Sequence, residues 1–332
     1  MEIFLFGCKD TTLHISKLFH KKGVLINLIT ISPSKGLEQK VAGYQDLTKH
    51  KELFKDIYIA KKYNLSDEND IEYFKNLNPS LGFAIGWQRL IPENILNCFS
   101  CGIFGMHGSA QDLPFGRGRS PMNWSLIEGR KWFYTNLFRY SSGIDNGEIV
   151  GKECFSIQLT DTAETLHYKN LLSFFKIVEK NWDSFLNNNI KLTPQKKGKG
   201  SLYPKRTPKD GIIDWDDDIH KIERLIRAVT KPFYGAFSYL NKIELIIYKA
   251  NIFYTDLESH PFLLKQNGEI CDVFPNGKFL VKANGGILII HDFKIIKSSS
   301  NIIKTGCILI SPEEKIKRFI SNKHGYFDLQ ED

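Results

Sequence analysis

Short apolar runs, separated by stretches long enough for helices, recur through the first half of the chain and constrain its fold most. The runs have the length and the β-branched or aromatic content of buried strands. They cover residues 2–6, 24–31, 56–60, 81–87 and 101–107. The stretch over residues 11–23 mixes polar and apolar residues as a crossover helix does. This alternation predicts a Rossmann-like, doubly wound, mostly parallel α/β sheet, which binds ligands at the carboxyl ends of its strands.

The second half of the chain has a different pattern. Residues 162–187 carry leucines and aromatics at helical spacing and predict one long amphipathic helix. Residues 187–201 are polar, basic and glycine-containing, as in a linker. A second helix is predicted over 214–229, with acidic residues in its first turn. The five strand-like runs that follow favour a small, OB-like β-barrel. They cover residues 236–240, 243–250, 269–274, 278–283 and 286–293.

Length and composition indicate a packed protein of two domains. The chain has 332 residues, 42% of them hydrophobic and 13% aromatic. We expect a catalytic domain over 1–190, a linker over 191–205, and an OB-like barrel domain with a terminal extension over 206–332. No apolar run reaches the roughly 18 residues of a membrane span, and no secretory signal is evident. Six scattered cysteines favour free, buried thiols in the cytoplasm and no metal site.

The net charge leaves the class of partner open. A formal charge of +8 suits nucleic acid, an anionic membrane surface or a small phosphorylated substrate. Much of the excess lies in residues 196–209 and 294–323, and neither stretch is a long basic helix with interleaved aromatics. The first predicted strand is followed by GCKDTT (residues 7–12), which is no dinucleotide or NTP fingerprint. A nicotinamide enzyme is therefore disfavoured.

One glycine-rich stretch, FGMHGSAQDLPFGRGRSPMNWSLIEG, carries the candidate chemistry. His107 follows a predicted strand, and an imidazole can accept a proton near neutral pH. Asp145, between glycines in SSGIDNGEIV, is the best candidate to orient that ring or relay its proton. Arg117 and Arg119 suit a phosphate, because guanidinium groups bind phosphate bidentately. Taken one by one, these residues also fit a structural histidine, a turn aspartate and a solvated loop.

The spacing of these residues follows a longer pattern. It reads H-x-S, then L-P-x-x-R-G-x-x-P-x-x-W, then a later I-D-x-G, and it runs from His107 through Trp124 to Gly147. The second half adds RTPKDGIIDW, LIRA and PFYGAF. In this order the motifs resemble the formyltransferase family that uses 10-formyltetrahydrofolate, whose signature is N-x-H-x-S-L-L-P-x-x-R-G-x-x-P-x-x-W with a later L-D-x-G. The resemblance extends over about residues 1–293.

The resemblance implies a site for 10-formyltetrahydrofolate as co-substrate and for an attacking amine. His107 is then the general base or proton shuttle, and Asp145 orients it or relays protons through water. The segment GWQRLIP resembles the pterin-binding wall of the family. The residues implied to bind the cofactor are Gln88, Arg89, Leu90, Ile91, Gly143 and Asp145. Ser109, Arg117 and Asn123 are implied on the side of the amine substrate, and the glycines are expected to make room for folate and substrate.

Within the family, GRGRSPMNW and PFYGAFSYL resemble the enzymes that formylate nucleotide-linked amino sugars. The expected substrate is the amino group of a UDP- or dTDP-linked amino-dideoxy sugar that is used for a surface glycan. The resemblance also implies a homodimer, with no nucleic-acid or membrane partner. One alternative is methionyl-tRNA formyltransferase, because the positive charge suits tRNA phosphates. The other is a catalytically silent homologue that only binds a nucleotide sugar or folate.

Two features depart from the family pattern. Gly105 stands where the family has an asparagine that donates a hydrogen bond to the oxyanion of the tetrahedral intermediate. Loss of such a donor costs about 10²–10³ in rate. The loop after His107 is also longer than the family spacing. Either another donor replaces the asparagine, with Gln88, Gln111 and Asn123 as candidates, or the activity is altered or lost.

Overall fold

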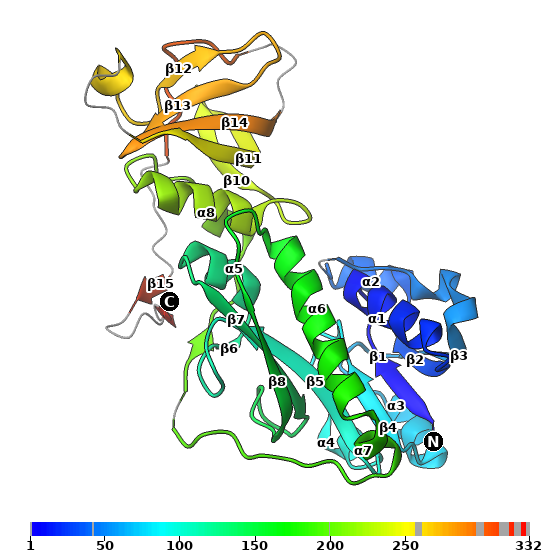
Figure 1. The fold of residues 1–332 in the computed structure, drawn as a ribbon. Helices are drawn as coiled ribbons and strands as arrows, with labels where there is room; N and C mark the ends of the chain where they lie inside the picture. The colour runs from blue at the N-terminus through cyan, green and yellow to red at the C-terminus, as the bar shows by residue number, and fades with distance from the viewer. Residues whose placement is uncertain are drawn as a thin grey trace. The chain divides into compact units, whose positions relative to one another are not determined.

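The chain forms two compact units, each built from more than one stretch of sequence (Figure 1). The computed structural model describes residues 2–41, 43–198, 200–255, 261–296, 302–311, 319–321 and 327–329. The first unit consists of Met1–Gly118, Trp132–Ser156 and His167–Ser201. The second consists of Arg119–Lys131, Ile157–Leu166 and Leu202–Asp332. Within the described ranges, no helix combines the length and the apolar character that crossing a membrane requires.

A seven-stranded sheet, in the order β3-β2-β1-β4-β5-β7-β8, forms the centre of the first unit. Its strands are β1 (Ile3–Phe6), β2 (Ile26–Thr30), β3 (Phe54–Ile59), β4 (Leu81–Ala84), β5 (Gly102–Ser109), β7 (Trp132–Arg139) and β8 (Ile149–Ser156). The first five pair in parallel, whereas β7 and β8 are antiparallel to their neighbours. The predicted Rossmann-like, mostly parallel sheet is confirmed.

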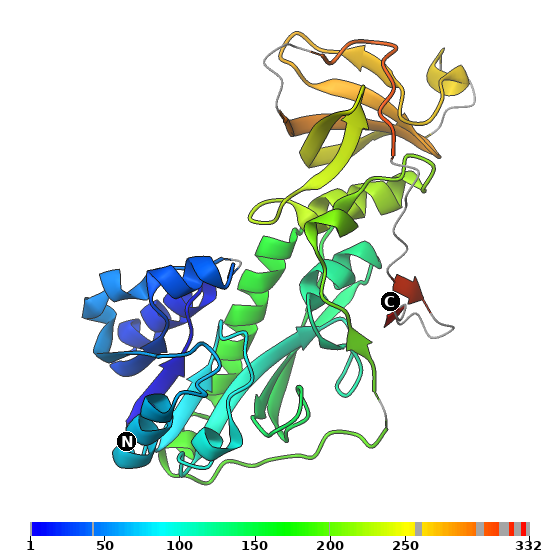
Figure 2. The same cartoon turned by 180° about the vertical axis from the view of Figure 1, so that it is seen from behind.

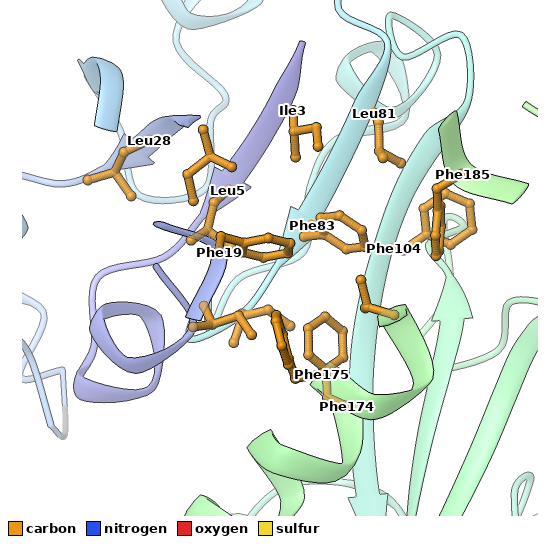
Figure 3. Close-up of a cluster of buried hydrophobic side chains, with 14 of the residues drawn as sticks. Ile3, Leu5, Phe19, Leu28, Leu81, Phe83, Phe104, Phe174, Phe175 and Phe185 are labelled. Atoms are coloured by element: carbon orange, nitrogen blue, oxygen red, sulfur yellow. The ribbon is translucent and has the colours of Figure 1, made fainter. Parts of the chain in front are cut away.

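Helices cover both faces of this sheet. On one face, α1 (Asp10–Lys21), α6 (Ala163–Lys180) and α7 (Trp182–Leu186) bury aromatic side chains against the strands (Figure 3). On the other face, α3 (Glu68–Leu77) buries Phe74 and α4 (Glu93–Leu96) buries Ile95 against the strands. Figure 2 shows the ribbon from this side. Each large apolar side chain buried in this way contributes about 1.5–3 kcal/mol. The sheet is therefore covered by helices on both faces, and polar ligands reach it mainly at the ends of its strands.

The helix predicted over residues 162–187 is two helices. Asn181 separates α6 from α7, and its amide Nδ2 donates to the carbonyl of Ile177 at 2.8 Å. This bond satisfies one of the carbonyls that the end of a helix leaves without a partner. Hydrophobic spacing continues through the break, so spacing alone did not reveal it.

The second unit contains α5 (Pro121–Ile127), α8 (Ile219–Val229) and a five-stranded antiparallel sheet in the order β10-β11-β14-β13-β12. The strands are β10 (Ala236–Leu240), β11 (Ile243–Tyr254), β12 (Ile270–Val273), β13 (Phe279–Ala283) and β14 (Gly286–Ile295). The five predicted strands are confirmed. Helix α8 begins later than predicted because Asp218 is its N-cap and accepts a hydrogen bond from the His220 N–H at 2.9 Å.

The remaining elements are short. They are α2 (Pro33–Glu38), β6 (Arg117–Gly118), β9 (Leu202–Tyr203), β15 (Phe319–Ser321), β16 (Phe327–Leu329) and the 3₁₀ turns Leu47–Lys49, Lys51–Leu53, Pro208–Gly211 and Pro261–Leu264.

A segment beyond β14 closes the sheet of the second unit. The strand order leaves β10 and β12 as its edges. Tyr239 of β10 exchanges two backbone hydrogen bonds with Ile310, of 3.1 and 2.8 Å. Ile270 of β12 donates its N–H to the carbonyl of Cys307 at 2.8 Å. Because residues 307–310 bond to both edges, they link β10 and β12 and close the sheet into a small barrel.

Packing of this closing segment should contribute to stability. Leu309 is 1% exposed, whereas its neighbour Ile310 is 49% exposed. We expect Leu309→Ala to lower the free energy of unfolding by about 2–5 kcal/mol, because it leaves a cavity in the barrel. Ile310→Ala keeps the same backbone bonds and should change it by only about 0.5 kcal/mol. Denaturant unfolding of the full chain measures both, and equal losses would contradict the packing role of the segment.

Candidate active site

Strand β5 extends beyond its parallel neighbour β4 and carries His107 past the end of that strand. Ala84, the last residue of β4, pairs with Gly105, so His107 lies two positions further on. On its other side, β5 pairs with antiparallel β7, where His107 stands opposite Asn136. The carboxyl ends of parallel strands are where ligands bind in open α/β sheets. His107 therefore lies where the sequence predicted a site.

Both ring nitrogens of His107 face oxygen atoms. Nδ1 lies 3.3 Å from Oδ2 of Asp145, and Nε2 lies 2.7 Å from the carbonyl oxygen of Gly116. The His107 side chain is 7% exposed and that of Asp145 is 21% exposed. A ring with one proton can donate to only one of these oxygens at a time, and a second proton allows both bonds. Both positions therefore suit N–H groups of the ring as donors.

The loop of Asp145 is fixed by hydrogen bonds from two other parts of the chain. Oδ2 of Asp145 accepts a bond from the N–H of Gly118 at 3.2 Å. Gln195 donates its amide Nε2 to the carbonyls of Asp145, at 2.7 Å, and Gly147, at 2.8 Å. The Gln195 amide oxygen in turn accepts a hydrogen bond from Arg117. Gln195 therefore ties the loop that carries Asp145 to the glycine-rich loop that flanks His107.

Sequence reasoning missed two residues of this site. Gln195 lies in the stretch predicted as a linker, where nothing distinguished it. Asn136 is fully buried, and neither atom of its amide has a partner in the part of the chain that the structure describes. Opposed residues of an antiparallel pair point to the same face, so this amide stands beside the ring of His107. A polar residue within an otherwise apolar strand was the signal available for it.

The segment predicted as the pterin-binding wall follows β4 directly. The N–H of Gln88 donates to the Tyr63 hydroxyl at 3.1 Å, and the Arg89 guanidinium lies 4.9 Å from the centre of the Tyr63 ring. Leu90 is 60% exposed, whereas Ile91 is buried in the core. The backbone of this segment is therefore anchored, Leu90 is exposed, and the side chains of Gln88 and Arg89 are partly exposed.

The residues predicted on the substrate side fall into different surroundings. Ser109 is buried, and its hydroxyl accepts a bond from the Gln111 N–H at 3.2 Å. Asn123 belongs to the second unit, and its amide donates to the carbonyl of Ala228 at 2.6 Å. Nε of Arg117 is buried and donates to no residue that the structure describes. Arg117 thus retains an open donor at Nε.

Other side chains of the protein occupy the space beside the glycines of the site. A Cβ on Gly105 would lie 2.0 Å from the ring of Tyr140, and one on Gly108 would lie 2.3 Å from the amide oxygen of Asn170. A Cβ on Gly143 would meet a side chain of its own loop at 2.1 Å. The expectation that the glycines make room for folate and substrate is therefore wrong at Gly105 and Gly108.

No cysteine in the described ranges contacts His107 or Asp145. Cys8, Cys101 and Cys271 are buried, whereas Cys154 is exposed, so the expectation that all the free thiols are buried is wrong. Burial raises the pKa of the Cys8 thiol and raises the pKa of Cys271 to about 11. These two thiols stay protonated at neutral pH and are poor nucleophiles. Among the described residues, no three His, Cys, Asp or Glu side chains gather as a metal site would require.

A Rossmann-like sheet with a His–Asp pair at its carboxyl edge, followed by a closed barrel, defines the class of this protein. The family described as "Formyl transferase" matches residues 16–173. The family described as "Formyl transferase, C-terminal domain" matches residues 205–302. The chain belongs to the formyl transferase family.

Individual relatives extend this result. The bifunctional polymyxin resistance protein ArnA of Wigglesworthia glossinidia brevipalpis is 32% identical over 277 residues, which span 78% of this chain but only 42% of ArnA. The N-formyltransferase of Helicobacter canadensis, solved with folinic acid and dTDP-3-aminofucose, has a TM-score of 0.61 and 17% identity over 89% of this chain and 100% of its own. Methionyl-tRNA formyltransferase of Clostridium thermocellum has a TM-score of 0.57 and 22% identity, over 90% and 100% of the two chains. Both solved structures share the fold.

The contact between Gly105 and Tyr140 can be tested by stability alone. Gly105→Ala should destabilise the protein by about 1–3 kcal/mol, because its methyl group would overlap the Tyr140 ring. Adding Tyr140→Ala should recover part of that loss, since residues in contact are energetically coupled. Free energies of unfolding of the two single variants and the double variant check this. Strictly additive changes would mean that the two residues do not touch.

Proposed function

We propose that this protein transfers a formyl group from 10-formyltetrahydrofolate to the amino group of a UDP- or dTDP-linked amino-dideoxy sugar, in the cytoplasm, for a surface glycan. The observation that carries the proposal is the pair of His107 and Asp145 at the end of β5 in a formyl transferase chain. The Helicobacter canadensis enzyme, solved with folinic acid and dTDP-3-aminofucose, supports this class of substrate. The 32% identity with ArnA supports it from the sequence side.

The chemistry that His107 and Asp145 supply is proton transfer. The amine nitrogen attacks the formyl carbon, a C–N bond forms, and the carbonyl oxygen takes up the negative charge. His107 accepts the proton of the amine, directly or through water, and the protonated ring donates to both Asp145 and the carbonyl of Gly116. The bond from the formyl carbon to the folate nitrogen then breaks, that nitrogen takes up a proton, and tetrahydrofolate leaves.

The surroundings of His107 fit a ligand with its own donors and acceptors. The buried amide of Asn136 offers one of each, and no described residue uses them. The anchored segment after β4 offers backbone groups beside an exposed Leu90. We assign folate to Gln88, Arg89, Leu90, Ile91, Gly143 and Asp145. The nucleotide sugar is assigned to Ser109, Arg117 and Asn123, with the open Nε of Arg117 suited to a phosphate or carbonyl oxygen.

Two further functions each have one observation in their favour. The net charge of +8 favours formylation of methionyl-tRNA, because binding of tRNA requires neutralisation of phosphates. Gly105 favours a silent homologue that binds a nucleotide sugar or folate without turnover, because the asparagine of the family is absent there.

Release of tetrahydrofolate separates these functions. The assay supplies 10-formyltetrahydrofolate with a panel of UDP- and dTDP-linked 3-amino and 4-amino sugars, and methionyl-tRNA in a parallel arm. Turnover with one sugar supports the proposal, and turnover only with methionyl-tRNA replaces it with the tRNA activity. Tight binding of a nucleotide sugar in calorimetry without turnover would support the silent homologue instead.

Substitution of the pair should remove turnover and spare binding. His107→Ala should lower kcat by about 10²–10⁴, because the general base is lost. Asp145→Asn should lower kcat by up to about 10⁴, because the ring loses its charged partner. Affinity for the nucleotide sugar, measured by calorimetry, should not change in either variant. His20→Ala, at an exposed position of α1, is the control. Loss of binding together with turnover would make both residues structural.

A further inference from the structure

Tyr140 follows β7 directly, and its ring covers Gly105. A Cβ on Gly105 would lie 2.0 Å from Cε1 and 2.7 Å from the hydroxyl oxygen of Tyr140. The ring stacks on Phe138, with centroids 5.4 Å apart and planes at 29°. The backbone N–H of Tyr140 donates to the carbonyl of Ile103 at 2.7 Å. The stack on Phe138 positions the ring, the backbone bond positions the residue beside β5, and position 105 has no room for a side chain.

The Tyr140 hydroxyl lies on the face of β5 that carries His107. Residues two apart in a strand share a face, so a side chain at position 105 would point the same way as that of His107. Bond lengths put the amide nitrogen of an asparagine about 2.4 Å from its own Cβ. The Tyr140 hydroxyl lies 2.7 Å from the Cβ position of residue 105. Measured from the Cβ position of residue 105, the Tyr140 hydroxyl therefore lies about as far away as the amide nitrogen of an asparagine at that position would lie.

The Tyr140 hydroxyl is protonated at neutral pH and is available as a hydrogen-bond donor. Burial raises the pKa of Tyr140 above its ordinary value of 10.0, and the nearby carboxylate of Asp145 raises it further. No hydrogen bond joins the hydroxyl to any residue that the structure describes. A neutral phenol is a good donor to an oxygen that gains negative charge.

We propose that the hydroxyl of Tyr140 stabilises the oxyanion of the formyl-transfer intermediate, in place of the side chain that Gly105 lacks. The inference rests on the proposed function. When the amine nitrogen bonds to the formyl carbon, an electron pair of the C=O bond moves to the oxygen, and Tyr140 donates a hydrogen bond to that oxygen without losing its proton. When the bond to the folate nitrogen breaks, the pair returns and the C=O bond forms again. Tyr140 is then a catalytic residue that is neither consumed nor ionised.

Tyr140→Phe is the decisive variant, because it keeps the ring against Gly105 and Phe138 and removes only the hydroxyl. The expected result is a fall in kcat of about 10²–10³ with unchanged KM for both substrates. Tyr168→Phe removes a hydroxyl from a 48% exposed position on α6 and should keep the wild-type rate. Asn136→Ala removes the other unpaired donor beside His107. A large loss of kcat there, with a wild-type rate for Tyr140→Phe, would overturn the inference in favour of Asn136.

A second pair of variants tests whether a donor restored at position 105 recovers activity, which a misfolded variant would not do. Gly105→Asn should not raise the rate, because the ring occupies the place of the new side chain. Gly105→Asn combined with Tyr140→Ala moves the donor back onto β5 and should be faster than Tyr140→Ala alone. If the wild type releases no tetrahydrofolate with any amine, the proposed function fails and this inference fails with it. If the wild type is active and Tyr140→Phe equals it, only this inference fails.

Discussion

The pairing of β5 with two neighbours of opposite direction determines the site. Parallel β4 ends level with Gly105, which leaves His107 beyond it. Antiparallel β7 ends opposite Phe104, so the chain that follows begins beside Ile103. Tyr140 is the first residue of that chain and covers the glycine, and Asp145 follows within the same loop and reaches His107. The register of β5 with β4 and with β7 therefore determines which residues surround His107.

The sequence was most informative where packing forces a pattern. Central parallel strands are buried on both faces and are therefore mostly apolar, so β1, β2, β4 and β5 were recognisable as short apolar runs. The exact bounds depended on single polar contacts, as at the cap by Asp218 and the break at Asn181. Such contacts leave no periodic signal, which explains why the helices were found but their ends were misplaced.

The glycines show a different limit of sequence reasoning. A glycine in a motif indicates that a Cβ is excluded, but not which atoms exclude it. The glycines near His107 suggested space for ligands, and at Gly105 and Gly108 the structure fills that space with Tyr140 and Asn170. These contacts depend on the register of β5 with β7 and on the packing of α6. They are long-range, so no local pattern in the sequence predicted them.

Residues 193–201, within the stretch predicted as a linker, show why the loops of a site are the hardest part to foresee. Thr193 and Ile149 exchange backbone hydrogen bonds of 2.9 and 2.8 Å, and the Ser201 hydroxyl accepts from the Gly116 N–H at 2.8 Å. With Gln195, this segment satisfies backbone groups of both loops that face His107. Such bonds need only polar side chains at irregular spacing, which is also the composition of a linker. Because Gln195 binds the carbonyl of Asp145 rather than its carboxylate, it fixes the loop without competing with His107 for that carboxylate.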